Sequence, residues 1–186
     1  MTPQEDGDDL WTVHDALTGA ALGRVSLGCA SVGSTTLPHA EGPCLSVDLA
    51  GGDGGGWIGT GRWEDGRPIV DVRASPYGVL ADVHPDGHGH LTVPMEDGRL
   101  TVCHLPDGAP EAVQEGDFDL CGGYLDADRV IAKEFDGPTA LFTSDSLEPI
   151  CTVSYPPGAV TDLPLPNGRG TWTTYARGRL QSWRTA

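Results

Sequence analysis

The stretch that decides the fold is "VHPDGHGHLTVPMEDGRLTVCHLPDGAP", residues 83–110. It contains a Pro-Asp-Gly turn, a short apolar stretch, a second turn that ends in Asp-Gly, and another apolar stretch. Asx-Gly pairs supply the positive φ angles that tight hairpin turns need. Short stretches rich in Val, Leu and Thr between such turns are typical of β-strands. This segment therefore predicts consecutive antiparallel strands joined by hairpins.

The same pattern returns further along the chain in "PNGRGTWTTYARGRLQSWR", residues 166–184. It again has a Pro-Asx-Gly turn, a strand, a Gly-Arg-Leu turn and a second strand. Pro166 follows Pro85 by 81 residues, which is two periods of about 40. A related unit lies between the two at residues 125–143, with Asp-Ala-Asp as its first turn. The sequence is therefore built on a repeat of about 40 residues.

Fainter copies occupy residues 49–72 and, as half a unit, residues 5–19. Each copy has a glycine at the tip of its predicted second hairpin: Gly7, Gly66, Gly98, Gly137 and Gly178. The residues five positions after the last three glycines are large or apolar, namely Cys103, Phe142 and Trp183. This spacing predicts a repeated packing position. No stretch has a convincing helical pattern, so we expect an all-β chain.

This unit resembles the blade of a WD40-type β-propeller over residues 5–186. His14 and Asp15 hold the positions of that family's Trp-Asp pair, and Trp183 holds the Trp position in the last unit. The structural His–Asp network of the family is not recognisable, so the blades are divergent. The resemblance implies one propeller domain of antiparallel sheets over residues 1–186, with residues 1–4 disordered. A β-sandwich or barrel of glycine-rich hairpins is the alternative.

The chain length limits the number of blades. At about 40 residues per blade, 186 residues make about four blades, whereas seven need about 280. If the N-terminal segment completes the last blade, both Trp11–Ala16 and Arg179–Arg184 fit the third-strand position of that blade. Residues 21–27 fit its outer strand. A simple closed ring would have one strand too many. An open partial propeller, two paired chains or a small distorted ring would each resolve this, and because unpaired edges invite association we expect a homodimer.

Charge and cysteine content restrict the partners and the location. Eleven basic residues face 27 acidic ones, a net charge of −16, so we expect neither nucleic acid nor an anionic membrane as partner. The N-terminus has no signal-peptide pattern, and no apolar run approaches the roughly 18 residues of a membrane span. The five cysteines lie far apart without a CxxC pair, which favours reduced thiols and a cytoplasmic protein.

The predicted second turns are rich in acidic residues. The resemblance implies that other proteins bind on the face that carries these turns, and carboxylates there would suit a basic partner. The candidate partner-binding residues are Glu64, Asp65, Glu96, Asp97, Asp136 and Arg177. The alternatives are that Asp is chosen for turn geometry and that the acidity only maintains solubility.

The histidines of "HPDGHGH" are candidate metal ligands. His84, His88 and His90, with neighbouring aspartates, are residue types that bind zinc or nickel. On a strand, His88 and His90 would lie on the same face. The corresponding "PNGRG" has no histidine, so the turn itself does not need imidazoles. The alternative is that these histidines are ordinary surface residues of a hairpin turn.

Signals for catalysis are sparse. There is no G-x-S-x-G motif, and Cys103 and His104 are strand neighbours that point to opposite faces. The glycine-rich residues 51–61 lack the Gly-Lys-Ser/Thr ending of a phosphate loop. Trp57 and Trp63 could stack on a ligand or fill a core. We expect no cofactor and predict a non-catalytic protein-interaction platform; the alternative is a small-molecule-binding protein or enzyme that uses the propeller channel.

Overall fold

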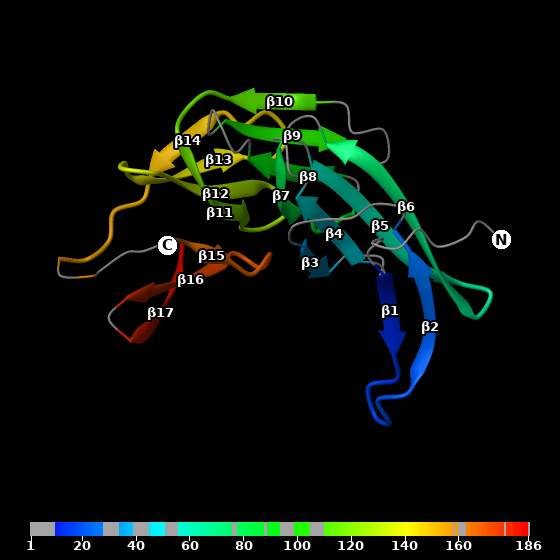
Figure 1. Ribbon diagram of the computed structural model, residues 1–186. Coiled ribbons are helices and arrows are strands. Elements are labelled where there is room, and N and C mark those ends of the chain that lie inside the picture. Colours follow the sequence, from blue (N-terminus) through cyan, green and yellow to red (C-terminus); the bar gives the residue numbers. More distant parts are fainter. Residues whose placement is uncertain are drawn as a thin grey trace. The chain divides into compact units, whose positions relative to one another are not determined.

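The computed structural model describes most of the chain as strands and turns (Figure 1). The residues that it describes are 10–27, 34–38, 45–50, 56–75, 78–87, 89–93, 99–104, 110–157, 159, 163–176 and 178–185. These residues contain no helix, as the sequence predicts. It follows that the described part of the chain has no helix long and apolar enough to cross a membrane.

The strands of the described residues form five sheets, in each of which neighbouring strands follow one another in sequence. Sheet A consists of β1 (Leu10–His14) and β2 (Ala21–Ser26). Sheet B consists of β3 (Ser34–Pro38), β4 (Leu45–Ala50), β5 (Gly56–Glu64) and β6 (Arg67–Ser75). Sheet C consists of β7 (Val79–Val83), β8 (Gly89–Val93), β9 (Leu100–His104) and β10 (Pro110–Gln114). Sheet D consists of β11 (Phe118–Tyr124), β12 (Arg129–Glu134), β13 (Thr139–Thr143) and β14 (Pro149–Thr152). Sheet E consists of β15 (Leu165–Pro166), β16 (Thr171–Ala176) and β17 (Arg179–Arg184).

The predicted hairpin turns appear where the repeat places them in sheets C and E. The β7–β8 turn closes through a hydrogen bond from Gly87 N to His84 O of 2.8 Å, and Gly87 has a φ of 81°. The β16–β17 hairpin turns at Gly178, with a φ of 77°. Its second strand coincides with the predicted strand at Arg179–Arg184. Turn chemistry therefore locates these hairpins correctly.

One turn lies in a different hairpin from the one predicted. Asp65 and Gly66, both with positive φ, form a two-residue turn between paired Glu64 and Arg67. This turn joins β5 to β6, the third and fourth strands of sheet B. The sequence predicted Gly66 at the second hairpin of its unit, between the second and third strands, and that prediction was wrong. An Asp-Gly pair satisfies the backbone of any two-residue hairpin and does not specify which hairpin it is. Gly137 lies in the turn between β12 and β13, the second and third strands of sheet D, as predicted. The remaining predicted tips, Gly7 and Gly98, lie outside the described residues.

The chain divides into two compact units, residues 1–79 and 80–186. Each unit is described by itself. A single propeller domain over residues 1–186 remains a prediction, and residues 1–4, expected to be disordered, lie outside the described residues.

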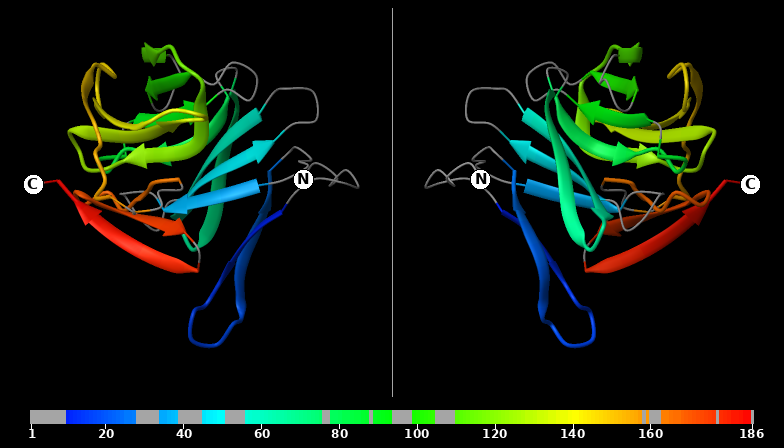
Figure 2. Two further views of the ribbon diagram at one scale, coloured as in Figure 1. Left: turned by 90° about the vertical axis from the view of Figure 1, so that its left-hand side faces the viewer. Right: turned by 90° about the vertical axis from the view of Figure 1, so that its right-hand side faces the viewer.

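In the first unit, the hairpin of sheet A packs on β5 and β6 (Figure 2). Trp11 belongs to a cluster with Leu27 and Trp57. A Cβ atom on Gly61 would lie 2.7 Å from Cη2 of Trp11, which is closer than real Cβ contacts. The glycine therefore provides the space into which the indole fits. This close approach gives a packing role to one glycine of the glycine-rich stretch.

In the second unit, the inner strands of sheet D, β12 and β13, are buried on both faces. Val130 and Phe142 pack with residues of sheet C such as Leu91. Ile131 packs on the opposite side with Trp172 of sheet E. Side chains alternate between the two faces of a strand, so neighbouring residues of one strand reach two different cores. Sheets C, D and E are therefore layers packed face to face, with sheet D in the middle.

A buried carboxylate also ties sheet C to sheet D. Asp82 on β7 accepts hydrogen bonds from Tyr124 N at 2.7 Å and Val83 N at 2.8 Å. Burial raises the pKa of the Asp82 carboxyl, although the two backbone hydrogen bonds oppose this. A Cβ on Gly123 would meet the Asp82 carboxylate and Pro166. Glycine therefore lets β11 pass between the two.

Sheet C also buries a histidine. His90 on β8 is 4% exposed, and its Nδ1 has no hydrogen-bond partner among the described residues. Burial lowers the pKa of His90 to about 4. The folded protein therefore holds this imidazole in its neutral form at neutral pH.

The Gly61→Ala substitution tests the close packing of sheet A on sheet B. We expect it to lower the free energy of unfolding by about 1–3 kcal/mol, because the new methyl group overpacks the Trp11 site. Trp11→Leu removes the ring atoms that the new methyl group would meet. The loss of unfolding free energy in the double variant Gly61→Ala/Trp11→Leu should therefore be smaller than the sum of the losses in the two single variants. Urea denaturation of the four proteins measures this. Strictly additive effects would contradict the contact.

The buried His90 predicts loss of stability on acidification. Its pKa of about 4 in the folded protein lies below the ordinary value of 6.5, so the unfolded chain binds the proton more readily. Stability should fall as the pH drops from about 6.5 to about 4, by roughly 3 kcal/mol in total. The raised pKa of Asp82 makes its contribution to stability change with pH in the opposite direction. The contribution of His90 is therefore obtained by comparing a His90 variant with the wild type.

His90→Gln removes the titrating group and should flatten the pH dependence of the urea midpoint between pH 7 and pH 4.5. His14→Gln, at an exposed histidine of β1, is the matched control and should leave the dependence unchanged. An equal slope in wild type and His90→Gln would mean that the histidine does not cause it.

Candidate functional site

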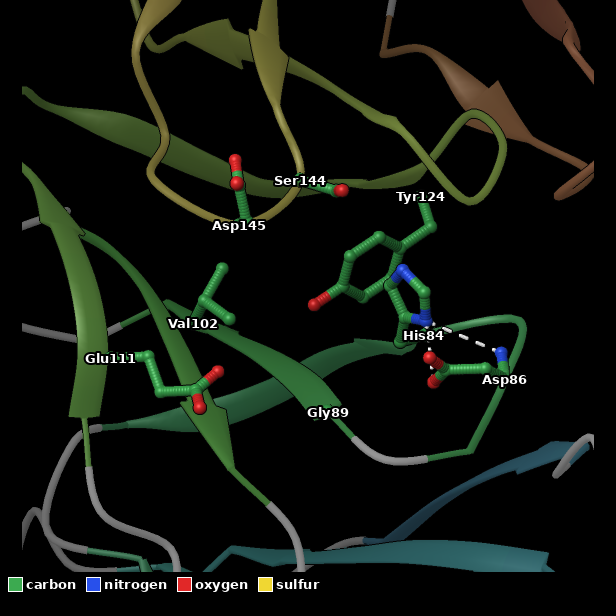
Figure 3. A pocket seen from close by; sticks show the side chains of 8 residues that line it. All are labelled: His84, Asp86, Gly89, Val102, Glu111, Tyr124, Ser144 and Asp145. Atoms are coloured by element: carbon green, nitrogen blue, oxygen red, sulfur yellow. Dashed lines mark hydrogen bonds and ion pairs between the residues drawn. The ribbon is translucent and has the colours of Figure 1, made fainter.

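A pocket of about 140 Å³ opens between sheets C and D, both in the second unit (Figure 3). The turns after β7 and β13 and strands β8, β9, β10 and β11 supply its walls. The lining residues are His84, Asp86, Gly89, Val102, Glu111, Tyr124, Ser144 and Asp145. The pocket thus combines one apolar floor residue and one aromatic ring with several polar side chains.

His84 is held in a fixed orientation at the pocket wall. Its Nε2 lies 2.8 Å from the carbonyl oxygen of Ala127, in the turn after β11. Its Nδ1 lies 2.6 Å from Oδ1 of Asp86 and accepts a longer hydrogen bond, 3.2 Å, from Asp86 N. The ring meets Tyr124 edge to face, with ring centres 4.8 Å apart. One imidazole therefore joins the turns of two neighbouring sheets.

The turn after β11 is fixed from its other side as well. Ser144 donates from Oγ to the Ala127 carbonyl at 2.8 Å, and its backbone N–H donates to Asp128 O at 2.9 Å. Arg129 binds Asp126, with Nε 3.0 Å from Oδ2, and this contact is the main reason that the pKa of Asp126 is lowered. The pocket wall is therefore a connected hydrogen-bonded frame.

The pocket lining is negatively charged. Asp86, Glu111 and Asp145 contribute three carboxylates, all on exposed residues. His84 is the lining residue that can carry a positive charge. The nearby Arg129 is paired with Asp126. Figure 3 shows the hydroxyl of Tyr124 directed into the space next to Val102. The lining carboxylates suit a cationic group.

The predicted metal ligands are only partly described. His84 lies in the pocket wall, whereas His90 lies in the buried part of β8 and His88 is outside the described residues. Within the described part of the chain, no three His, Cys, Asp or Glu residues are grouped to hold a metal ion. Metal binding by the three histidines remains a prediction.

The predicted partner-binding acids occupy two kinds of turn. Asp136 is exposed in the second turn of sheet D, as expected. Glu64 and Asp65 are exposed at the third turn of sheet B, and Glu64 is paired with Arg62 at 2.5 Å. The remaining candidates lie outside the described residues: Glu96, Asp97 and Arg177. Partner binding by these residues stays a prediction.

The two predicted stacking tryptophans lie on one face of β5, since they are six residues apart. Trp57 packs with Leu27 in the core of the first unit. Trp63 is paired with Pro68 and lies close to Gly23 of β2. Both therefore contribute to the packing of sheet A on sheet B, and ligand stacking by them remains a prediction.

The comparisons with known proteins identify the fold. No family model matches the chain, and no curated protein matches it in sequence. The C-terminal WD40 domain of Sif2 superposes with a TM-score of 0.59 at 10% identity, covering 89% of this chain and 48% of that one. BamB from Moraxella catarrhalis has a TM-score of 0.50 at 15% identity and covers 83% and 48%. Hsv2 from Kluyvelomyces marxianus has a TM-score of 0.42 at 8% identity, covering 89% and 70%.

The chain spans about half the length of the first two of these structures. Its successive meander sheets, packed face to face in the second unit, agree with the propeller architecture. The resemblance expected from the repeat is thereby confirmed for the fold. The chain has a β-propeller fold of antiparallel sheets like that of WD40 domains, in partial form.

Proposed function

We propose that this protein is a non-catalytic interaction platform that binds a basic protein partner. The observation that carries the proposal is the pocket between sheets C and D, with its three carboxylates and its aromatic ring. The partner would insert a lysine or arginine side chain there. The acidic second turn of sheet D, at Asp136, is the alternative binding surface that the sequence suggests for such a partner.

The charge balance around the pocket supports a cationic ligand. An ammonium or guanidinium group in the pocket is attracted by the carboxylates of Asp86, Glu111 and Asp145, which line it. Tyr124 is 1% exposed and forms a closed part of the wall. Three carboxylates that line one concave site attract a cation more strongly than the one or two of an isolated turn. The pocket is therefore a better cation site than an isolated acidic turn.

The rigid frame supports a binding role as well. Ala127 accepts hydrogen bonds from both His84 and Ser144, so the turns of the pocket are fixed before any partner arrives. A preformed site loses little conformational entropy on binding. Ser144 Oγ is engaged with that carbonyl rather than with a histidine nitrogen, which favours a structural role for this hydroxyl over a nucleophilic one.

The alternative is a small cationic molecule in the same pocket, which would use the same carboxylates without a protein partner. A cytoplasmic location belongs to the proposal too, because Cys151 is an exposed free thiol and such thiols persist in reducing compartments.

The proposal is tested with a fluorescent peptide of alternating Lys and Ala residues, followed by fluorescence anisotropy at low salt. The double variant Glu111→Gln/Asp145→Asn removes two pocket carboxylates and should weaken binding about tenfold, since each exposed ion pair contributes up to about 1 kcal/mol. The matched control is Glu134→Gln/Asp136→Asn, which removes equal charge from the second turn of sheet D, where both residues are exposed.

If the control variant retains binding and the pocket variant loses it, the pocket is the binding site of the peptide. Equal losses in both would mean that the peptide responds only to net charge, and a larger loss in the control would assign binding to the second turn. Lysine alone as competitor distinguishes the small-molecule alternative, because it should displace the peptide only if the free amine binds in its own right.

A further inference from the structure

The β15–β16 turn carries the only asparagine of the chain, and a glycine follows it. Asn167 is exposed and is joined to Gly168 in the Pro-Asn-Gly turn. A main-chain nitrogen can attack the side-chain amide carbon of the asparagine that precedes it, because the two atoms close a five-membered ring. The nitrogen of glycine is the least hindered, since glycine has no side chain. The two residue types that this reaction needs are therefore adjacent in one exposed turn.

Gly168 leaves its nitrogen accessible to the side chain of Asn167. Its φ is 69°, a conformation that glycine adopts without strain. A Cβ atom built on Gly168 would have Pro85 Cγ at 3.9 Å as its near neighbour, which is an ordinary contact. The backbone N–H of Gly168 donates no hydrogen bond within the described part of the chain. Among the described residues, neither close packing nor a hydrogen bond shields this nitrogen.

The amide group of Asn167 is held by hydrogen bonds within the same turn. Its Oδ1 accepts from the backbone nitrogen of Arg169 at 3.0 Å and from that of Thr171 at 3.4 Å. Its Nδ2 donates to Thr171 Oγ1. The side chain must leave these partners before its carbon can reach the nitrogen of Gly168. The folded turn therefore slows the reaction relative to the unfolded chain.

The first turns of the neighbouring sheets show that aspartate fits at this position. The matching Pro-Asx-Gly turn of sheet C has Asp86 in place of Asn167. In sheet D, Asp126 Oδ1 accepts from the backbone nitrogen of Asp128 at 3.1 Å, as Asn167 Oδ1 does from Arg169 two residues on. A carboxylate keeps this acceptor and loses only the donor to Thr171. Conversion of Asn167 to aspartate is therefore compatible with the fold of sheet E.

We propose that Asn167 is a site of spontaneous deamidation in the folded protein, at a rate restrained by its hydrogen bonds in the turn. The nitrogen of Gly168 loses its proton to solvent and bonds to Cγ of Asn167, and Nδ2 leaves as ammonia. Water then opens the cyclic imide at either carbonyl, which gives aspartate or isoaspartate. Each product adds one negative charge. This inference goes beyond the proposed function and does not depend on it.

The first test follows the mass of the folded wild-type protein held at pH 8. The proteolytic fragment that contains Asn167 should gain the mass difference between a hydroxyl and an amino group. It should also separate into two products of equal mass, because isoaspartate lengthens the backbone. Asn167→Gln is the matched control, since its longer side chain would have to close a six-membered ring, and it should keep its mass.

The second test concerns the restraint. Thr171→Val removes the hydroxyl that accepts from Nδ2 and should raise the rate about fivefold, the factor for loss of one hydrogen bond of ordinary strength. Thr173→Val, two residues further along β16, is the control and should leave the rate unchanged. Urea denaturation checks that both variants remain folded.

The chain unfolded in urea should react faster than the folded protein. A folded protein that gains no mass while the unfolded chain does would overturn the proposal, as would a gain that persists in Asn167→Gln. Equal rates in the wild type and Thr171→Val would overturn the restraint by this hydrogen bond.

Discussion

The structure of the second unit depends on the two-sided burial of sheet D. Val130 and Ile131 are adjacent in β12, yet they belong to different cores, one shared with sheet C and one with sheet E. A sheet that is apolar on both faces cannot be solvated on either, so it must have a sheet on each side. The stacking of blades is thus a direct consequence of side-chain alternation, and the polar site follows from it.

Stacking sheets face to face leaves their strand ends and turns to form the polar surface. Asp82 fixes β7 to the backbone of β11, and His84 fixes the turn after β7 to the turn after β11. The pocket lies between these two sheets and is lined by the turns after β7 and β13 and by Val102. Of its carboxylates, that of Asp86 is next to His84, the residue that joins the turns after β7 and β11. A change that loosens this alignment should alter the pocket before it unfolds the core.

Local turn chemistry explains how far the sequence could predict this structure. The Pro-Asp-Gly turn at Asp86 and the turn at Gly178 were placed correctly because positive φ angles require such residues. The same local rule misplaced Gly66, since it does not count the strands that precede the turn. The candidate pocket was not predictable beyond the turn that carries His84. Glu111 and Asp145 come from separate strands and turns, and only the packing of sheets brings them together.

The distribution of charge and of apolar burial gives the second unit two kinds of contact that respond differently to salt. The pocket attracts cations through the carboxylates that line it. The cores that hold sheet D between its neighbours consist of apolar side chains such as Val130 and Ile131. A contact made mainly of charges weakens as salt rises, whereas burial of apolar side chains persists. Partner binding at the pocket should therefore weaken at ionic strengths that leave the alignment of the sheets intact.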